Sequence, residues 1–82
     1  MTEPEILEAL TPIFRSALSN DAIVLSPEMS PATIPKWDSF RYVDIILRIE
    51  ESLNVRIRSR EANKLRNVGE MVKLIKEKQD AA

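Results

Sequence analysis

The chain contains no cysteine and no histidine. Without cysteine it can form neither a disulfide framework nor a thiolate metal site. The lack of cysteine is compatible with a reducing cytoplasm. Without histidine it lacks the commonest general base and the usual activator of a serine nucleophile. We therefore expect a protein that is not itself an enzyme and that binds no metal.

Long apolar runs are missing as well. No stretch reaches the roughly 18 consecutive apolar residues that a membrane-spanning helix needs. The acidic start at Glu3 and Glu5 differs from the basic and then apolar start of a secretory signal peptide. We expect a cytoplasmic protein that neither spans a membrane nor is secreted.

What the chain does contain is enough for one compact domain. Its 82 residues are 44% hydrophobic and 30% charged, with a single glycine, and this composition is typical of a globular rather than a disordered chain. Only one core can form at this length. We predict a single domain over residues 1–82, with frayed ends at residues 1–3 and 79–82.

The first helix is predicted from Thr2 onward. Thr2 with Glu5 three residues later has the pattern of a capping box, and apolar residues then recur at helical spacing as far as Leu18. Pro12 interrupts the pattern and is expected to kink or divide the helix. Residues 19–21 then supply a stop.

A long loop is predicted over residues 19–37. Pro27, Pro31 and Pro35 recur every fourth residue there and forbid a long helix. Loops of this length in small domains usually pack through their own side chains or carry function. The residues available to attach it to the core are Ile23, Val24, Leu25, Met29 and Ile34.

A second long helix is expected to begin at Asp38 or Ser39 and to end at Asn54. Its apolar residues fall into two stripes. The wider stripe, suited to a core face, contains Tyr42, Ile45, Ile46, Ile49 and Leu53, and a second ridge beside it contains Phe40, Val43 and Leu47. The ridge either packs against the long loop or faces a partner, and the pattern leaves both possibilities open.

The rest of the chain predicts two more helices. Ser59 can cap a brief helical turn that holds Ala62 and Leu65, and Asn67 with Glu70 three residues later can start a final helix. The fold class is therefore all-α, with three main helices, one short helix and a long first loop.

Charge is distributed unevenly along the sequence. Residues 1–55 carry four basic and nine acidic side chains, whereas residues 56–82 carry eight basic and four acidic ones. Most of the positive excess lies in Arg56, Arg58, Arg60, Lys64 and Arg66. A cluster of this kind is either a solvated face or a contact for nucleic acid or another polyanion, and no aromatic residue is interleaved for base stacking.

The tetrapeptide from Trp37 to Phe40 stands at the junction between the long loop and the second helix. It places the hydroxyl of Ser39 at a helix N-terminus, where unpaired backbone N–H groups favour an anionic substituent such as a phosphodiester. No histidine is available to deprotonate Ser39. Ser39 is better interpreted as an acceptor that another enzyme modifies, unless Asp38 and Ser39 only cap the helix.

These residues resemble the acyl carrier protein family, whose members carry Asp-Ser-Leu at the start of their second helix. The resemblance covers most of the chain. Asp38-Ser39-Phe40 matches the attachment motif, residues 43–57 resemble the family's apolar second helix and its exit, Glu61-Ala62-Asn63-Lys64-Leu65 resembles a Glu-Ala-x-Lys-Ile segment, and Asn67-Val68 matches the start of the last helix. Such context makes a short motif specific.

The resemblance implies an acyl-carrier-like four-helix bundle that carries 4′-phosphopantetheine on Ser39, with Asp38 beside it. A phosphopantetheinyl transferase would attach the arm from coenzyme A with Mg²⁺. The thiol of the arm would then hold an acyl or aminoacyl group as a thioester, loaded by a ligase and used by synthases or transferases. A monomer is expected.

The resemblance also implies a docking face for partner enzymes, which includes Trp37, Phe40, Arg41, Val43, Asp44, Leu47, Arg48, Glu51, Arg58 and Arg60. Several of these residues depart from the family pattern: Arg41 and Arg48 occupy often acidic or neutral positions, and Lys36-Trp37 replaces a small pair. Trp37 could instead anchor the loop over the second helix. Because charge complementarity excludes wrong partners, the departures predict a specialised pathway rather than housekeeping fatty acid synthesis.

Two other functions remain open on the sequence alone. The chain could be a small helical interaction or nucleic-acid-binding module that uses residues 56–66, or a carrier-like scaffold that is no longer modified. A carrier requires Ser39, whereas a nucleic-acid binder requires the arginines and loses affinity steeply with salt.

Overall fold

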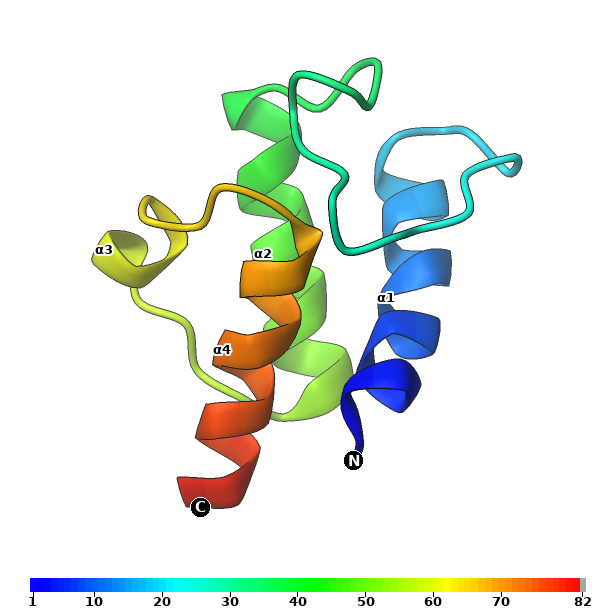
Figure 1. Cartoon of the computed structure of the whole chain (residues 1–82). Helices are drawn as coiled ribbons and strands as arrows, with labels where there is room; N and C mark the ends of the chain where they lie inside the picture. Colours follow the sequence, from blue (N-terminus) through cyan, green and yellow to red (C-terminus); the bar gives the residue numbers. More distant parts are fainter. Residues whose placement is uncertain (82) are drawn as a thin grey trace.

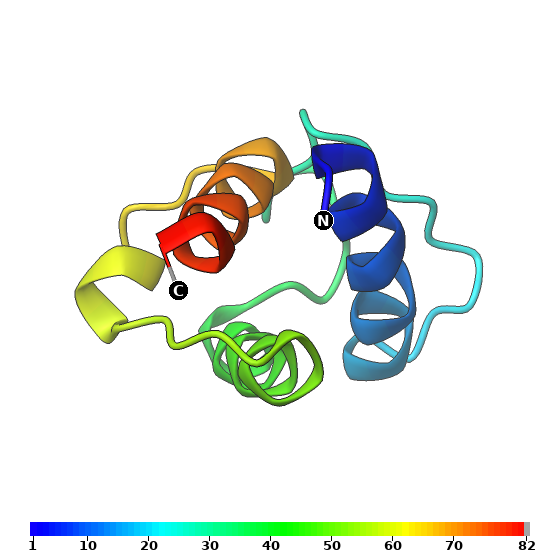
Figure 2. The ribbon, with the colours of Figure 1, turned by 90° about the horizontal axis from the view of Figure 1, so that it is seen from below.

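The computed structural model describes residues 1–81, which form four helices and no strand. The helices are α1 (Glu3–Ala17), α2 (Ser39–Leu53), α3 (Ser59–Ala62) and α4 (Val68–Ala81). α1 runs upward in Figure 1 whereas α2 and α4 run downward, so that α1 is antiparallel to both. Seen from below, the three long helices surround one core and α3 lies at the edge (Figure 2). The predicted all-α four-helix bundle is confirmed.

α1 begins at the predicted capping box. Oγ1 of Thr2 accepts a hydrogen bond from the backbone N–H of Glu5 (3.3 Å), and Oε1 of Glu5 accepts one from the backbone N–H of Thr2 (2.7 Å). Pro12 does not divide the helix, because it lies on the exposed side, where the carbonyl that it leaves unpaired can be solvated.

Fraying at residues 1–3 and 79–82 stays a prediction, and within the described residues the structure shows contacts at both ends. Glu3 belongs to α1, and residues 79–81 belong to α4. The capping box holds one end, while the side chains of Lys76 and Gln79 contact Met1 and so join the two ends. Ala82, also expected to be frayed, lies outside the described residues.

The long loop between α1 and α2 packs onto the bundle, as its apolar residues predicted. Ile23, Leu25 and Ile34 are buried, whereas Val24 faces solvent. Two backbone hydrogen bonds join the loop to the start of α4, from Val68 N–H to the Met29 carbonyl (2.9 Å) and from Gly69 N–H to the Pro27 carbonyl (2.8 Å). A Cβ atom at Gly69 would lie 3.1 Å from Pro27, so glycine permits this close approach.

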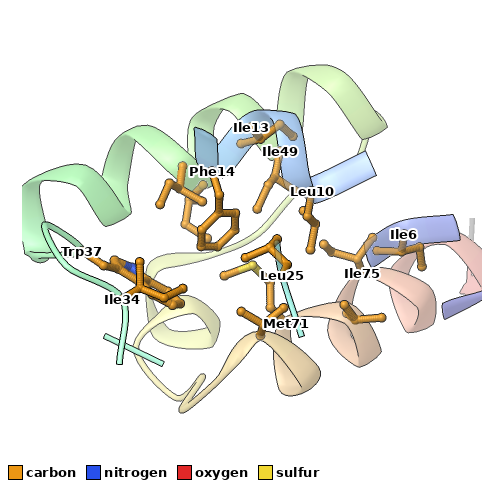
Figure 3. Packing of buried hydrophobic residues seen from close by; sticks show 14 of the residues in the cluster. Ile6, Leu10, Ile13, Phe14, Leu25, Ile34, Trp37, Ile49, Met71 and Ile75 are labelled. Atoms are coloured by element: carbon orange, nitrogen blue, oxygen red, sulfur yellow. The ribbon is translucent and has the colours of Figure 1, made fainter. Parts of the chain in front are cut away.

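The core is built around Phe14, which is fully buried (Figure 3). The Trp37 ring meets Phe14 edge-on, with ring centroids 5.1 Å apart and planes 87° apart. From the other helices, Ile45 and Ile49 of α2 and Met71 and Ile75 of α4 close the core. The wide apolar stripe predicted for α2 therefore faces inward.

α2 begins and ends where the sequence predicted, with Asp38 as N-cap and Asn54 in the left-handed conformation after the last turn. α3 differs slightly from its prediction. Its N-cap is Arg58 and not Ser59, because Arg58 has extended backbone and Ser59 is the first helical residue. The backbone N–H of Arg58 donates to Oε1 of Glu61 (3.0 Å). The cap of α4 is confirmed, since Oδ1 of Asn67 accepts from the Glu70 N–H (2.8 Å).

Within residues 1–81, no helix combines the length and the apolar character that crossing a bilayer requires.

Candidate functional site

Ser39 is the first residue of α2, and the fold leaves its hydroxyl accessible. The preceding Asp38 has extended backbone, and its Oδ1 accepts a hydrogen bond from the backbone N–H of Arg41 (2.9 Å). Asp38 thereby performs the capping role, and Ser39 is not needed for it. Ser39 is exposed, and its hydroxyl makes no hydrogen bond to any other residue within 1–81.

The electrostatics at this end of α2 suit an anionic substituent on Ser39. The first N–H groups of a helix have no intrahelical acceptor, and the helix dipole adds partial positive charge there. The carboxylate of Asp38 accepts the hydrogen bond from the Arg41 N–H, and the first turn of α2 itself contains no acidic residue. The free hydroxyl and the backbone N–H groups of the first turn that Asp38 does not bind therefore fit a phosphodiester bonded to the Oγ of Ser39.

Two hollows flank Ser39. A small one of about 230 Å³ is lined by Pro31, Trp37, Asp38, Ser39 and Tyr42. A shallow and mostly apolar groove of about 440 Å³ runs along α2, lined by Ser39, Phe40, Val43, Asp44 and Leu47. A flexible chain attached to Ser39 would have an apolar surface on either side.

Tyr42 contributes to this site, although its place in the sequence pattern assigned it only to the core. Its hydroxyl donates to the carbonyl of Ala62 (2.6 Å), which ties α3 to α2 one turn from Ser39. Burial raises the pKa of Tyr42 to about 12. Its spacing in the sequence could have placed it near Ser39. Residues three apart on a helix share a face, and Tyr42 follows Ser39 by three residues.

Trp37 was predicted on the docking face, and the structure corrects this placement. Its side chain is only 7% exposed and packs between Phe14 and Tyr42, with ring centroids 5.1 and 5.9 Å away. Trp37 is therefore an anchor that holds the long loop on the core, which was the alternative interpretation. Lys36 turns the chain toward the core with a positive φ of 70°, which a lysine rarely adopts.

The second apolar ridge of α2 faces solvent. Phe40 is 87% exposed, Val43 60% and Leu47 59%. The alternative that this ridge packs against the long loop is therefore wrong. Three apolar side chains aligned on one exposed face of a helix form a surface that a partner can cover; we call Phe40, Val43 and Leu47 the apolar ridge.

The charged residues predicted around this ridge are not equivalent. Nε of Arg48 lies 3.1 Å from Oδ1 of Asp44, and Nη1 of Arg48 donates to Oγ of Ser16 on α1 (2.9 Å). Arg41 is half-buried, and Nη1 of its guanidinium is buried without a hydrogen-bond partner within residues 1–81. Glu51, Arg58 and Arg60 are exposed. Arg48 and Asp44 are thus engaged within the molecule, and Ser16, which sequence reasoning missed, holds Arg48 in place.

Known acyl carrier proteins are similar to this chain in sequence and in fold. No protein-family model matches the chain. It is 36% identical to an acyl carrier protein of Thermosynechococcus vestitus over 95% of this chain and 96% of that protein. It is 31% identical to an acyl carrier protein of Helicobacter pylori, over 88% of this chain and 92% of that protein. The solution structure of a holo acyl carrier protein from Geobacter metallireducens superimposes with a TM-score of 0.85 at 37% identity, covering 92% of this chain and 86% of that one.

Proposed function

The chain belongs to the acyl carrier protein family, and on this premise we propose that Ser39 bears a 4′-phosphopantetheine arm. The observation that carries the proposal is the arrangement at the start of α2. Asp38 caps the helix, which leaves the Ser39 hydroxyl exposed and without a hydrogen bond within residues 1–81. When bound, the arm supplies a thiol that can hold an acyl or aminoacyl group as a thioester.

Modification of Ser39 requires a second protein. The chain has no histidine, and the carboxylate of Asp38 is turned to the Arg41 N–H. Among the described residues 1–81, no side chain is therefore placed to activate Ser39. We propose that a phosphopantetheinyl transferase joins the Oγ of Ser39 to the phosphorus of the arm. The hydroxyl loses its proton, and the nucleotide part of coenzyme A leaves. The role of this chain is to present Ser39.

The apolar ridge is the proposed docking face for the transferase and for the enzymes that load and use the cargo. It begins one residue after Ser39 and extends two helical turns along α2, so that a protein seated on it reaches the arm. Exposed apolar residues at the centre of an interface contribute most of its affinity. Exposed Glu51, Arg58 and Arg60 would lie around it.

A specialised pathway is the part of the proposal that depends on charge. The enzymes of ordinary fatty acid synthesis are expected to offer basic patches to acidic carriers, whereas this chain carries exposed Arg58 and Arg60 beside α2. Like charges across an interface disfavour the complex.

We further propose that the chain works as a monomer in the cytoplasm, whose reducing conditions would keep the thiol of the arm free.

The test is the intact mass of the purified protein after incubation with coenzyme A, Mg²⁺ and a broad-specificity phosphopantetheinyl transferase. We expect one phosphopantetheinyl increment in the unaltered protein and in Ser52→Ala, and none in Ser39→Ala. Ser52 is a matched control because it is also an exposed serine on α2. An increment that persists in Ser39→Ala, or its absence with every active transferase, would contradict the proposal.

A further inference from the structure

The segment that contains α3 carries an unneutralised positive charge. Five of its side chains are basic and exposed: Arg56, Arg58, Arg60, Lys64 and Arg66, here called the basic segment. None of the five forms an ion pair with another residue within 1–81. The ion pairs within residues 1–81 use Arg48, Lys76 and Lys78.

The one acidic residue inside this segment does not neutralise it. The carboxylate of Glu61 accepts a hydrogen bond from the backbone N–H of Arg58 (3.0 Å) and pairs with Nζ of Lys78 on α4 (2.9 Å). These contacts keep the pKa of Glu61 below its ordinary value, so that it is ionised and already partnered at neutral pH. The five basic side chains are exposed, and within residues 1–81 none of them is held in an ion pair.

The basic segment is attached to α2 on the side of the helix next to Val43 of the apolar ridge. Oε2 of Glu50 accepts from the backbone N–H of Ile57 (2.9 Å), so that side of α2 faces the linker before α3. Val43 and Glu50 are seven residues apart and therefore lie on the same strip of the helix. The Tyr42 hydrogen bond to Ala62 fixes the other end of α3 against α2. Figures 1 and 2 both show α3 and its linker at the edge of the bundle, beside α2.

From this arrangement we infer that the basic segment and the apolar ridge form one interface for a protein whose docking surface is apolar at its centre and acidic at its rim. An apolar centre with arginines around it is the composition of a protein interface. A nucleic acid would use the cations but not the ridge, and no aromatic residue in the basic segment offers a stacking surface. The inference rests on the proposed function, because a carrier must dock with other proteins.

Two amphipathic helical peptides test the inference on the full chain. Both have the same leucine stripe, flanked by glutamates in one and by lysines in the other. We expect the glutamate peptide to bind about tenfold more tightly, with an affinity that falls as salt rises, and to shift the amide NMR signals of Val43, Leu47 and the basic segment. Equal binding of both peptides, or of neither, would overturn the inference.

Variants locate the effect and separate it from the proposed function. Arg60→Glu should lower the affinity for the glutamate peptide about fivefold. Lys73→Glu, which reverses an exposed charge on α4, should leave this affinity unchanged. If Arg60→Glu does not fold, Arg56→Glu takes its place. The peptides are tested on the chain without the arm, so that a failed Ser39 modification and a failed docking surface give different results. Tighter binding of a DNA duplex or of anionic lipid vesicles than of the glutamate peptide would assign the basic segment to those partners and contradict the inference.

Discussion

Asp38 and Ser39 have different roles at the start of α2. Asp38 makes the capping hydrogen bond, and Ser39 provides a hydroxyl that makes none within residues 1–81. The sequence predicted that both residues belong to the helix start, since both are good N-cap types. It could not predict which of them caps, because this depends on the backbone turning from extended to helical between positions 38 and 39.

This division predicts different costs for the two substitutions. Asp38→Ala should lower the free energy of unfolding by about 1 kcal/mol, since it removes a cap. Ser39→Ala should change it by less than about 0.5 kcal/mol, since Ser39 is exposed and its hydroxyl is unbonded. Urea denaturation measures both. If Ser39→Ala proved the more destabilising variant, Ser39 would be the structural residue and the roles assigned to the two side chains would be wrong.

Tyr42 is the chain's single tyrosine, and its ionisation contributes to the pH dependence of stability. Burial raises its pKa from 10.0 to about 12 in the folded protein. Below pH 10 the phenol is neutral in both states, and its contribution to stability is complete. Between pH 10 and about 12 the unfolded chain ionises first, so stability falls as pH rises through this window.

Tyr42→Phe should remove this part of the pH dependence. It should also cost about 1 kcal/mol at neutral pH, because the hydrogen bond from the Tyr42 hydroxyl to the Ala62 carbonyl is lost. Denaturation curves at neutral pH and between pH 10 and 12, for both proteins, measure the two effects. An ultraviolet titration of the folded protein that gives a tyrosine pKa near 10 would show that Tyr42 is not buried as described.

At the scale of elements, hydrophobic periodicity predicted α1, α2 and α4 correctly. It could not decide which apolar stripe of α2 faces inward. Both stripes are apolar, and the choice is made by Phe14, Met71 and the loop residues that fill the space opposite Ile45 and Ile49. Trp37 was misplaced for the same reason, because its burial depends on Phe14, which lies more than twenty residues away in the sequence.

The loop anchor predicts a large energetic cost. Trp37→Ala should lower the free energy of unfolding by about 3 kcal/mol or more, as loss of a buried aromatic ring leaves a cavity. Trp37→Phe should cost far less, because the indole N–H has no hydrogen-bond partner within residues 1–81 to lose. Denaturation followed by far-ultraviolet circular dichroism measures both variants. A cost below about 1 kcal/mol for Trp37→Ala would place the indole at the surface, as the docking prediction had it.

The apolar ridge predicts the opposite behaviour, a functional cost without a structural one. Leu47→Gln should leave stability within about 0.5 kcal/mol of the unaltered protein, since Leu47 is mostly exposed. It should lower kcat/KM for modification by the transferase about tenfold, since an apolar contact at the centre of the interface is lost.

The matched control for the ridge is Val24→Gln. Val24 is an apolar side chain of similar exposure that lies in the long loop and not on α2. Steady-state modification rates of the three proteins should show a loss in Leu47→Gln alone. An equal loss in both variants would mean that the transferase responds to general surface polarity, and the ridge would not be its docking face.

At the scale of the whole molecule, length, helix order and the motif at Ser39 together predicted the family and the four-helix bundle. The uneven charge was also visible in the sequence. The placement of that charge in space was not. Only the folded chain brings residues 56–66 beside the apolar ridge, through the contacts of Glu50 with Ile57 and of Tyr42 with Ala62.

The most direct test of the central claim is the mass of this protein isolated from its own cells, with fragmentation to locate any modification. We predict a phosphopantetheinyl group on Ser39 and on no other residue. A protein that carries no such group under growth conditions in which it is expressed, or that carries it elsewhere, would contradict the claim that Ser39 is the attachment site.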